Sequence, residues 1–395
     1  MKNFERDNSV DVAINNAMNE FRNINVSYKI SQYGETYMTT IIELDKVDLA
    51  NENYRGNGKG IGEQSLASGL FEALEHYLGS PNVIARAVIP KKISQLYCQE
   101  NVNNEYPIKM LYQQNPEFIV DCETFIEYGS NSSKIFYPAF LTHPMYSQKS
   151  LNGSKLRLYS TNNGTSVGLN LEEALLHGIN EVIERDSISV HLIQTFISSK
   201  KNTIKVINQD SCPSFLKKLI DECNTTLENL KIIDITSDLS IPTYLVKGNK
   251  RGNELPIVGT GSSISVKYAL ERALLECLQS YYLHDETLEK EDRTNLDKLG
   301  KYKPLLNCLL LNYECSEKLI DFRDYPIESE NLTLRDQLDK INMSLNKNGY
   351  KMFFKTIYKS ENLFCIKVIV PGLEKFHLVR SGVGLPLSSR GETFL

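Results

Sequence analysis

The sequence lacks the marks of a nucleic-acid binder, a secreted protein and a membrane protein. Its formal net charge is only -5 and no stretch is rich in lysine or arginine, so we expect no nucleic-acid partner. The opening residues, MKNFERDNSVDV, have no apolar core of the kind that a secretory signal needs. The longest apolar runs, such as CLLL at 308–311 and IVPGL at 369–373, are too short to cross a membrane. We therefore expect a cytoplasmic protein with no membrane partner.

Metal-binding patterns of cysteine are absent as well. The 8 cysteines are scattered, with no CxxC pair and no histidine at the spacing of metal ligands, which argues against a structural zinc site. Cys277 and Cys365 lie within apolar periodic segments, where cysteine behaves as a small hydrophobic residue. We expect both to be buried free thiols.

Helical and strand-like patterns alternate along all 395 residues. Such interleaving favours a single mixed α/β (α+β) domain over 1–395 rather than separate all-α and all-β parts. It divides into an N-terminal helix with strands (1–50), a core that carries the motifs below (51–290), a charged, broken surface excursion (291–331), and a closing helix, hairpin and tail (332–395). From periodicity and turn signals we expect helices at 9–22, 63–78, 105–113, 171–196, 213–226, 265–286 and 332–347, and strands at 25–31, 36–44, 83–89, 124–128, 134–140, 231–235, 243–248, 351–358 and 362–372.

Three of these helices carry polar residues at one spacing, each after a glycine-rich stretch that we interpret as a loop. The stretches are RGNGKGIGE at 55–63, NNGTSVG at 162–168 and VGTGSS at 258–263. The helices read Ser68-x-x-x-Glu72-x-x-Glu75, His177-x-x-x-Glu181-x-x-Glu184 and Arg272-x-x-x-Glu276-x-x-Gln279. Residues four and three apart share a helix face. A single acidic pair ordinarily marks a solvated face, but two such pairs and a Glu–Gln pair, all after glycine turns, favour one shared site.

The chemistry of these residues predicts a nucleotide site. The helix at 64–78 contains no lysine or arginine, and apolar residues flank its acids, so buried carboxylates there would need a cation. Mg²⁺ fits, because it takes carboxylates together with substrate phosphates. Glycine-rich loops at helix N-termini can bring backbone N–H groups to phosphate. Lys59, Arg185 and Arg272 are the candidate phosphate cations. The first loop is not a Walker A motif.

At these residues the chain resembles the YcaO family. The matching stretches run in order over most of the sequence: GKGIGEQSLASGLFEALEHY at 58–77, NNGTSVGLNLEEALLHGINEVIERDS at 162–187, GTGSSISVKYALERALLECLQS at 259–280 and VIVPGLEKF at 368–376. The resemblance implies a fold unlike kinases and P-loop proteins, and a site that binds ATP with Mg²⁺. It also implies that the enzyme phosphorylates the oxygen of a peptide backbone amide, after which a nucleophile attacks the amide carbon.

The resemblance also implies roles for individual residues. The Mg²⁺ ligands it implies are Glu72, Glu75, Glu181, Glu184 and Glu276. The residues that contact ATP or order the site are Ser68, Arg185, Arg272 and Gln279, with Lys59 and Asn163 as further candidates in the loops. Glu173 is an additional candidate ligand, although acids in a first helical turn are ordinary partners of the helix dipole. No general base or other catalytic residue can be assigned.

The acceptor half of the reaction stays open among three alternatives. The first is azoline-forming cyclodehydration of a ribosomally made precursor peptide. The second is thioamide or amidine formation by the same activation, and the third is an ATP-binding accessory factor for modification of a ribosomal protein. Azoline-forming members often end in a proline-rich tail, whereas this chain ends GLPLSSRGETFL. Since no segment before residue 50 looks suited to grip a leader peptide, we expect a leader-binding partner protein, and homodimers are common in the family.

Overall fold

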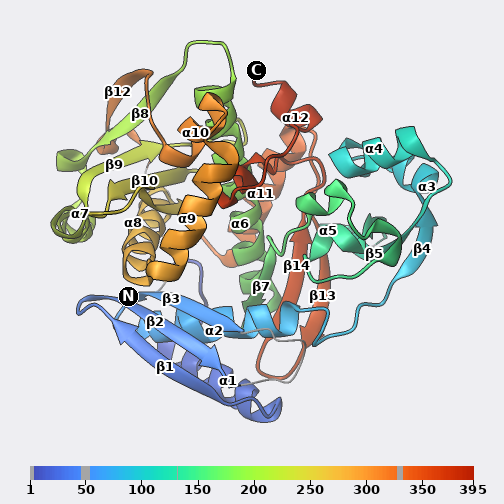
Figure 1. Cartoon of the computed structure of the whole chain (residues 1–395). Coiled ribbons are helices and arrows are strands. Elements are labelled where there is room, and N and C mark those ends of the chain that lie inside the picture. Colours follow the sequence, from blue (N-terminus) through green and yellow to red (C-terminus); the bar gives the residue numbers. More distant parts are fainter. Residues whose placement is uncertain (1–3, 46–53, 131, 327–331) are drawn as a thin grey trace.

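The computed structural model describes residues 4–45, 54–130, 132–326 and 332–395. These ranges fold into three sheets with helices packed between and around them (Figure 1). The expected mixed α/β class is confirmed. Within the described ranges no helix is both long enough and apolar enough to span a bilayer. All eight cysteines are free, and Cys277 and Cys365 are buried as expected.

The first sheet is a three-stranded antiparallel sheet that two helices cover on one face. Its order is β1-β2-β3, with β1 Tyr28–Tyr33, β2 Tyr37–Leu44 and β3 Arg55–Ile61. The helices are α1 Val10–Asn23 and α2 Glu63–Gly79. The hydroxyl of Ser9 accepts a hydrogen bond from the N–H of Val12 and begins α1. Phe21, Ile42 and Leu70 belong to the core between sheet and helices.

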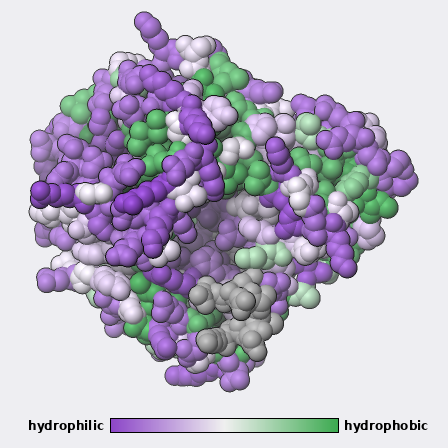
Figure 2. Space-filling model, in the orientation of Figure 1, coloured by the Kyte–Doolittle hydropathy of each residue, from purple (hydrophilic) through white to green (hydrophobic). Residues whose placement is uncertain are grey.

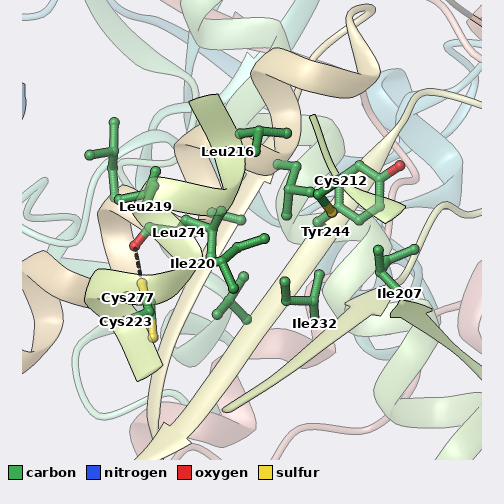
Figure 3. Packing of buried hydrophobic residues seen from close by; sticks show 14 of the residues in the cluster. Ile207, Cys212, Leu216, Leu219, Ile220, Cys223, Ile232, Tyr244, Leu274 and Cys277 are labelled. Carbon is green, nitrogen blue, oxygen red and sulfur yellow. Dashed lines mark hydrogen bonds between the residues drawn. The ribbon is translucent and has the colours of Figure 1, made fainter. Parts of the chain in front are cut away.

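The second sheet has the order β11-β10-β9-β8-β12. Its strands are β8 Thr203–Asn208, β9 Glu228–Asp234, β10 Thr243–Asn249, β11 Ile257–Ser262 and β12 Ser316–Asp321. Its helices are α7 Ser214–Thr226 and α8 Val266–Leu283. Figure 3 shows the core that joins them, where the thiol of Cys223 on α7 contacts the carbonyl of Leu274 on α8 at 3.8 Å. This packing fixes α8 against the sheet.

The third sheet has the order β4-β5-β13-β14-β7, and β6 also pairs with β5. Its strands are β4 Ile89–Lys92, β5 Ile119–Glu127, β6 Lys134–Pro138, β7 Thr165–Gly168, β13 Phe353–Lys359 and β14 Phe364–Ile369. The long helix α6 Leu171–Leu192 packs on β7 and β14 and lies near the middle of the molecule in Figure 1. The other helices around this sheet are α3 Ile93–Tyr97, α4 Tyr106–Gln114, α5 Ala139–Thr142 and α11 Leu334–Lys347.

The charged segment at 291–331 is more ordered than its sequence indicates. It runs through α9 Glu286–Leu299, α10 Lys303–Leu310 and β12, and its last residues, 327–331, lie outside the described ranges. Most of α9 is exposed, as expected of a surface segment, but Cys308, Leu309 and Leu311 are buried. Apolar residues of α10, rather than the charges around it, decide its place.

Two strand predictions need correction. Residues 83–88 form turns and irregular backbone, and only Ile89–Lys92 pairs with β5. Strand β8 was missed, because its sequence TIKVIN is short and follows the polar stretch SSKKN without a turn signal. It is an inner strand that pairs with β9 and, in parallel, with β12.

The glycine-rich stretches are strands, not loops, and this is the main correction to the sequence prediction. Residues 55–61 form β3 and 257–262 form β11, while only the first part of the stretch at 162–168 is a turn. A Cβ atom on Gly58 would lie 1.9 Å from the carbonyl oxygen of Ser65, and one on Gly259 would lie 2.1 Å from the backbone nitrogen of Cys277. The glycines therefore let α2 and α8 lie directly on the strands that precede them.

Candidate functional site

One cavity of about 470 Å³ lies where α2, α6 and α8 face each other. Figure 2 shows a hollow near the middle of one face of the molecule, surrounded largely by hydrophilic residues. The structure brings ten of the predicted site residues to the cavity wall: Lys59, Ser68, Glu72, Glu75, Glu181, Glu184, Arg185, Arg272, Glu276 and Gln279. Asn163 does not line it; its Oδ1 is buried without a partner among the described residues, and its neighbour Asn162 lines the cavity instead.

Carboxylates from α6 and α8 meet at one side of the cavity. The hydroxyl of Thr260 on β11 donates to Oε1 of Glu184 at 2.7 Å and lies 3.2 Å from Oε1 of Glu276. The other oxygen of Glu276 is paired with the ammonium group of Lys59 on β3. Burial, with the charge of Glu276, raises the pKa of Glu184. The pKa of Glu276, by contrast, is lowered, because the charges of Lys59 and Arg185 outweigh the effect of burial, which acts to raise it.

Arg185 lies between two of these acids without a tight contact to either. Its guanidinium nitrogens are 3.8 Å from Oε1 of Glu181 and 3.7 Å from Oε1 of Glu184. The second oxygen of Glu181 accepts a hydrogen bond of 2.9 Å from the N–H of Gly164. Gly164 has φ of 80°, a conformation that glycine adopts without strain. The turn before β7 therefore does present a backbone N–H to the site, but to a glutamate.

The end of the cavity formed by α2 is rich in carboxylates. Burial raises the pKa of Glu75 well above its ordinary value, and the charges of Glu181 and Glu72 add to the rise. Nε2 of His177 is 4.0 Å from Oε2 of Glu75. Burial lowers the pKa of His177 well below its ordinary value, so its imidazole is neutral at pH 7 and offers Glu75 no charge. Clustered acids of this kind are stabilised by an added cation.

Arg272 on α8 is a half-buried cation with unused hydrogen-bonding capacity. Its Nε atom is buried and has no partner among the described residues. Burial lowers the pKa of Arg272, but the charge of Glu5 and neighbouring acidic groups outweigh burial and the pKa is raised. A permanently charged guanidinium with a free donor at a cavity wall suits an anionic ligand.

Sequence reasoning did not find Arg6 at the cavity wall, nor Asp7 and Thr260, which form hydrogen bonds to glutamates of that wall. Arg6 lines the cavity, and the N–H of Asp7 donates to Oε1 of Glu173 at 2.9 Å. Glu173, weighed as a candidate ligand, lines the cavity too. No local pattern links Arg6 to helices that begin more than fifty residues later. Thr260 lies in a glycine-rich stretch that predicts a loop, and its sequence does not indicate a contact with a glutamate. Only the tertiary fold brings these residues to the three helices.

Residues 57–374 match the family described as YcaO cyclodehydratase, ATP- and Mg²⁺-binding. The chain belongs to the YcaO family. An uncharacterized protein of Methanothermobacter thermautotrophicus is similar over 384 residues at 23% identity, which covers 91% of this chain and 95% of that protein. This YcaO domain therefore binds ATP and Mg²⁺, as its family does, and the expected family and cofactors are confirmed.

Several solved structures share the fold of this chain. The structure of YcaO from Methanopyrus kandleri bound with AMPPCP and Mg²⁺ matches with a TM-score of 0.68 and 18% identity, covering 96% of both chains. A heterocyclase in complex with substrate and cofactor also matches with a TM-score of 0.68, at 16% identity over 97% of this chain; the chain spans 58% of its length. The Escherichia coli microcin synthetase McbBCD complex matches with a TM-score of 0.63 at 14% identity, covering 88% of both chains.

The residues of this cavity fit both groups. Its volume is ordinary for a small-molecule site, and the unpartnered Nε of Arg272 is a donor without an acceptor. As they stand, no three His, Cys, Asp or Glu side chains within the described ranges are close enough to enclose a metal ion. Lys59 and Arg185 partly neutralise the acids where a metal ion would otherwise do so. The raised pKa of Glu75 and of Glu184 indicates that the negative charge of these two acids is not fully neutralised by the protein.

Proposed function

We propose that this cavity binds MgATP and uses it to activate a backbone amide of a peptide by phosphorylating the amide oxygen. The observation that carries the proposal is the composition of one wall. Carboxylates from three helices meet there, burial raises the pKa of Glu75 and Glu184, and the Nε of Arg272 beside them has no partner among the described residues. Family membership over 57–374 supports it. The reaction class is an ATP-dependent cyclodehydration.

The metal ligands in this proposal are the five glutamates of the three helices, Glu72, Glu75, Glu181, Glu184 and Glu276. Oxygen ligands of this kind suit Mg²⁺, which would neutralise the phosphate charge that develops during transfer. Thr260 holds one oxygen of Glu184 and leaves the other free. Glu173 is less suited, because its two oxygens already accept from the N–H groups of Asp7 and Leu169.

The phosphate groups of ATP are assigned to the cations of the cavity. Arg272 and Arg185 would contact them, and Lys59 would exchange part of its ion pair with Glu276 for a phosphate oxygen. Ser68, Gln279 and Asn163 would order the surrounding wall, with Asn163 acting from behind Asn162. The protein then contributes positioning and charge stabilisation, which is what phosphoryl transfer requires.

The acceptor in this proposal is a ribosomally made precursor peptide. Once the amide oxygen carries phosphate, a Cys, Ser or Thr side chain attacks the amide carbon, an azoline ring forms and phosphate leaves with the former amide oxygen. The likeness in fold to a heterocyclase and to a microcin synthetase complex supports this product, and a leader-binding partner protein would deliver the peptide. A sulfur donor attacking the same carbon would instead give a thioamide.

Peptide mass and nucleotide turnover test the proposal together. The protein is expressed with a Cys/Ser/Thr-rich precursor peptide and its partner, and the peptide mass and the release of ADP and phosphate are measured. Loss of one water per ADP means a ring, and exchange of oxygen for sulfur means a thioamide. ATP binding without any turnover stimulated by peptide and partner would contradict the enzymatic function and favour an accessory factor.

A further inference from the structure

The turn of α6 that carries Glu184 and Arg185 continues into Asp186, a buried acid that faces away from the cavity. The side chain of Asp186 has no exposed surface. Its carboxylate accepts a fork of two hydrogen bonds from Arg390, from Nε at 2.7 Å and from a terminal nitrogen at 2.7 Å. Arg390 lies on α12 Ser389–Glu392, more than two hundred residues later. The helix α6, which carries site residues, is therefore bonded on the side away from the cavity to the C-terminal helix α12.

Like Asp186, Arg390 is buried, and it makes several further contacts. Its guanidinium also donates to both oxygens of Asp238, at 2.6 and 3.2 Å. It also lies 5.1 Å from the ring centre of Tyr350 and 5.4 Å from that of Phe394. Only 4% of its side chain is exposed. Contacts with two carboxylates and two rings fix the orientation of this planar guanidinium. Because Asp186 is bonded to it by two hydrogen bonds, the position of Asp186 is fixed as well.

The same segment is attached a second time through Glu374. The N–H of Glu374 donates to Oδ1 of Asp186 at 2.9 Å. Its carboxylate accepts from the hydroxyl of Ser388 at 2.6 Å and from the Ser388 N–H at 3.1 Å. One turn further along α6, the hydroxyl of Ser189 donates to the carbonyl of Arg185 at 2.7 Å. Polar contacts as well as apolar packing therefore hold α6 directly after Glu184 and Arg185.

From this geometry we propose that Arg390 is a positioning residue for the nucleotide site, because its buried ion pair with Asp186 fixes the α6 turn that presents Glu184 and Arg185. A buried ion pair is weak support for stability, since its desolvation offsets much of its attraction, whereas it does define one geometry. Arg185 makes no contact shorter than 3.7 Å with the acids beside it. Its direction therefore depends on the backbone that Arg390 holds. This inference rests on the proposed nucleotide site.

The variants are chosen to separate positioning from stability. Arg390→Lys keeps the charge and most of the side-chain volume but loses the fork, and Asp186→Asn loses the charge of the acid at constant shape. The control is Glu20→Gln, because Glu20 is also buried and accepts three hydrogen bonds, from Tyr358, Ser360 and Asn362, but does not line the cavity. For each protein, Tm is measured first. The Kd of AMPPCP with Mg²⁺ is then measured at a temperature well below that Tm.

The wild-type protein is titrated first with AMPPCP and Mg²⁺, because this titration tests the proposed nucleotide site independently of Arg390. If wild type binds AMPPCP with Mg²⁺, we expect Arg390→Lys and Asp186→Asn to raise its Kd at least tenfold, and Glu20→Gln to change it less than twofold at a comparable loss of Tm. Equal Kd in wild type and the Arg390 and Asp186 variants overturns the positioning role but leaves the site intact. Failure of wild type to bind overturns the proposed function itself.

A measurement on the unmodified protein covers the case in which these variants do not fold. Coupling between two parts of a protein is reciprocal, so a segment that positions the nucleotide site is itself stabilised when nucleotide binds. We expect AMPPCP with Mg²⁺ to slow amide hydrogen exchange at 385–395 at least threefold. Unchanged exchange there, with protection of 181–186, would mean that the segment is not coupled to the site and would overturn the inference.

Discussion

Lys59 on β3 forms an ion pair with Glu276 on α8, two residues separated by 217 positions in the sequence. The pair links the first sheet to the helix of the second sheet across the cavity. It also lowers the pKa of Glu276 against the effect of burial. In the proposed site, the carboxylate would exchange some of this contact for Mg²⁺, and the ammonium group would be available to phosphate.

Replacement of Lys59 should therefore weaken nucleotide binding in a pH-dependent way. In Lys59→Met, Glu276 loses its strongest cationic neighbour, its pKa rises and it binds a metal ion less well at neutral pH. We expect the Kd of MgAMPPCP to rise about tenfold, equivalent to about 1.4 kcal/mol, and to recover partly as the pH increases. Titrations at several pH values check this. Lys355→Met, which removes the cation beside Glu123 at 2.6 Å, is the control. Binding that is unchanged in Lys59→Met would contradict the role given to Lys59, and a loss independent of pH would contradict its effect on the pKa of Glu276.

The acids of the cavity should make the nucleotide-free protein less stable as the pH rises. Because the pKa of Glu75 is raised in the folded state, the folded protein keeps a proton that the unfolded chain releases above its ordinary pKa. The stability linked to this proton is present at acid pH and is lost as the pH rises through the folded-state value, by up to about 1.4 kcal/mol per pH unit. Chemical denaturation between pH 5 and 8 measures the slope. Glu75→Gln should flatten it; an identical slope in both proteins would contradict this account.

Thr260 should affect the site through Glu184 rather than through ligand contacts. In Thr260→Val the hydroxyl that holds Glu184 and approaches Glu276 is lost. We expect the Mg²⁺ concentration needed for half-maximal nucleotide binding to rise about tenfold, in the range found when partners of metal ligands are removed. Thr243→Val is matched, since that hydroxyl is also buried and bonded, to Ile241 and Ser262. A comparable loss of Mg²⁺ response in both variants would attribute the effect to general destabilisation.

Alanine at Gly58 should prevent close packing of α2 on β3. The added Cβ would meet backbone atoms of Ser65 and Gly69 that cannot move independently of the helix. We expect a loss of about 3 kcal/mol or more, the range of severe overpacking, measured by urea unfolding. Gly384→Ala is the control, because the nearest atom to its added Cβ is 3.7 Å away on Leu299. Equal stability of both variants would show that the glycines are not needed for packing.

The residues that meet at the cavity were easier to predict from sequence than the strands beside them. The seven-residue spacing on α2, α6 and α8 depends only on helix geometry, so Glu72, Glu181 and Glu276 could be assigned to common faces before any fold was known. The glycines of β3 and β11 carry two compatible explanations, a phosphate loop or a close strand–helix contact, and local sequence does not separate them. Arg390 could not be linked to Asp186 at all, because the contact exists only after both ends of the domain have packed.

The central claim is that the glutamates of three helices form a Mg²⁺-dependent nucleotide site. Calorimetric titration of AMPPCP into wild type and Glu184→Gln, each with and without Mg²⁺, tests it most directly. The account predicts that wild type binds only when Mg²⁺ is present. It also predicts that Glu184→Gln keeps the Tm of wild type but binds AMPPCP about 10- to 100-fold more weakly, the scale of a lost contact at a metal site. Binding of equal strength by the two proteins, or binding by wild type that does not depend on Mg²⁺, would contradict it.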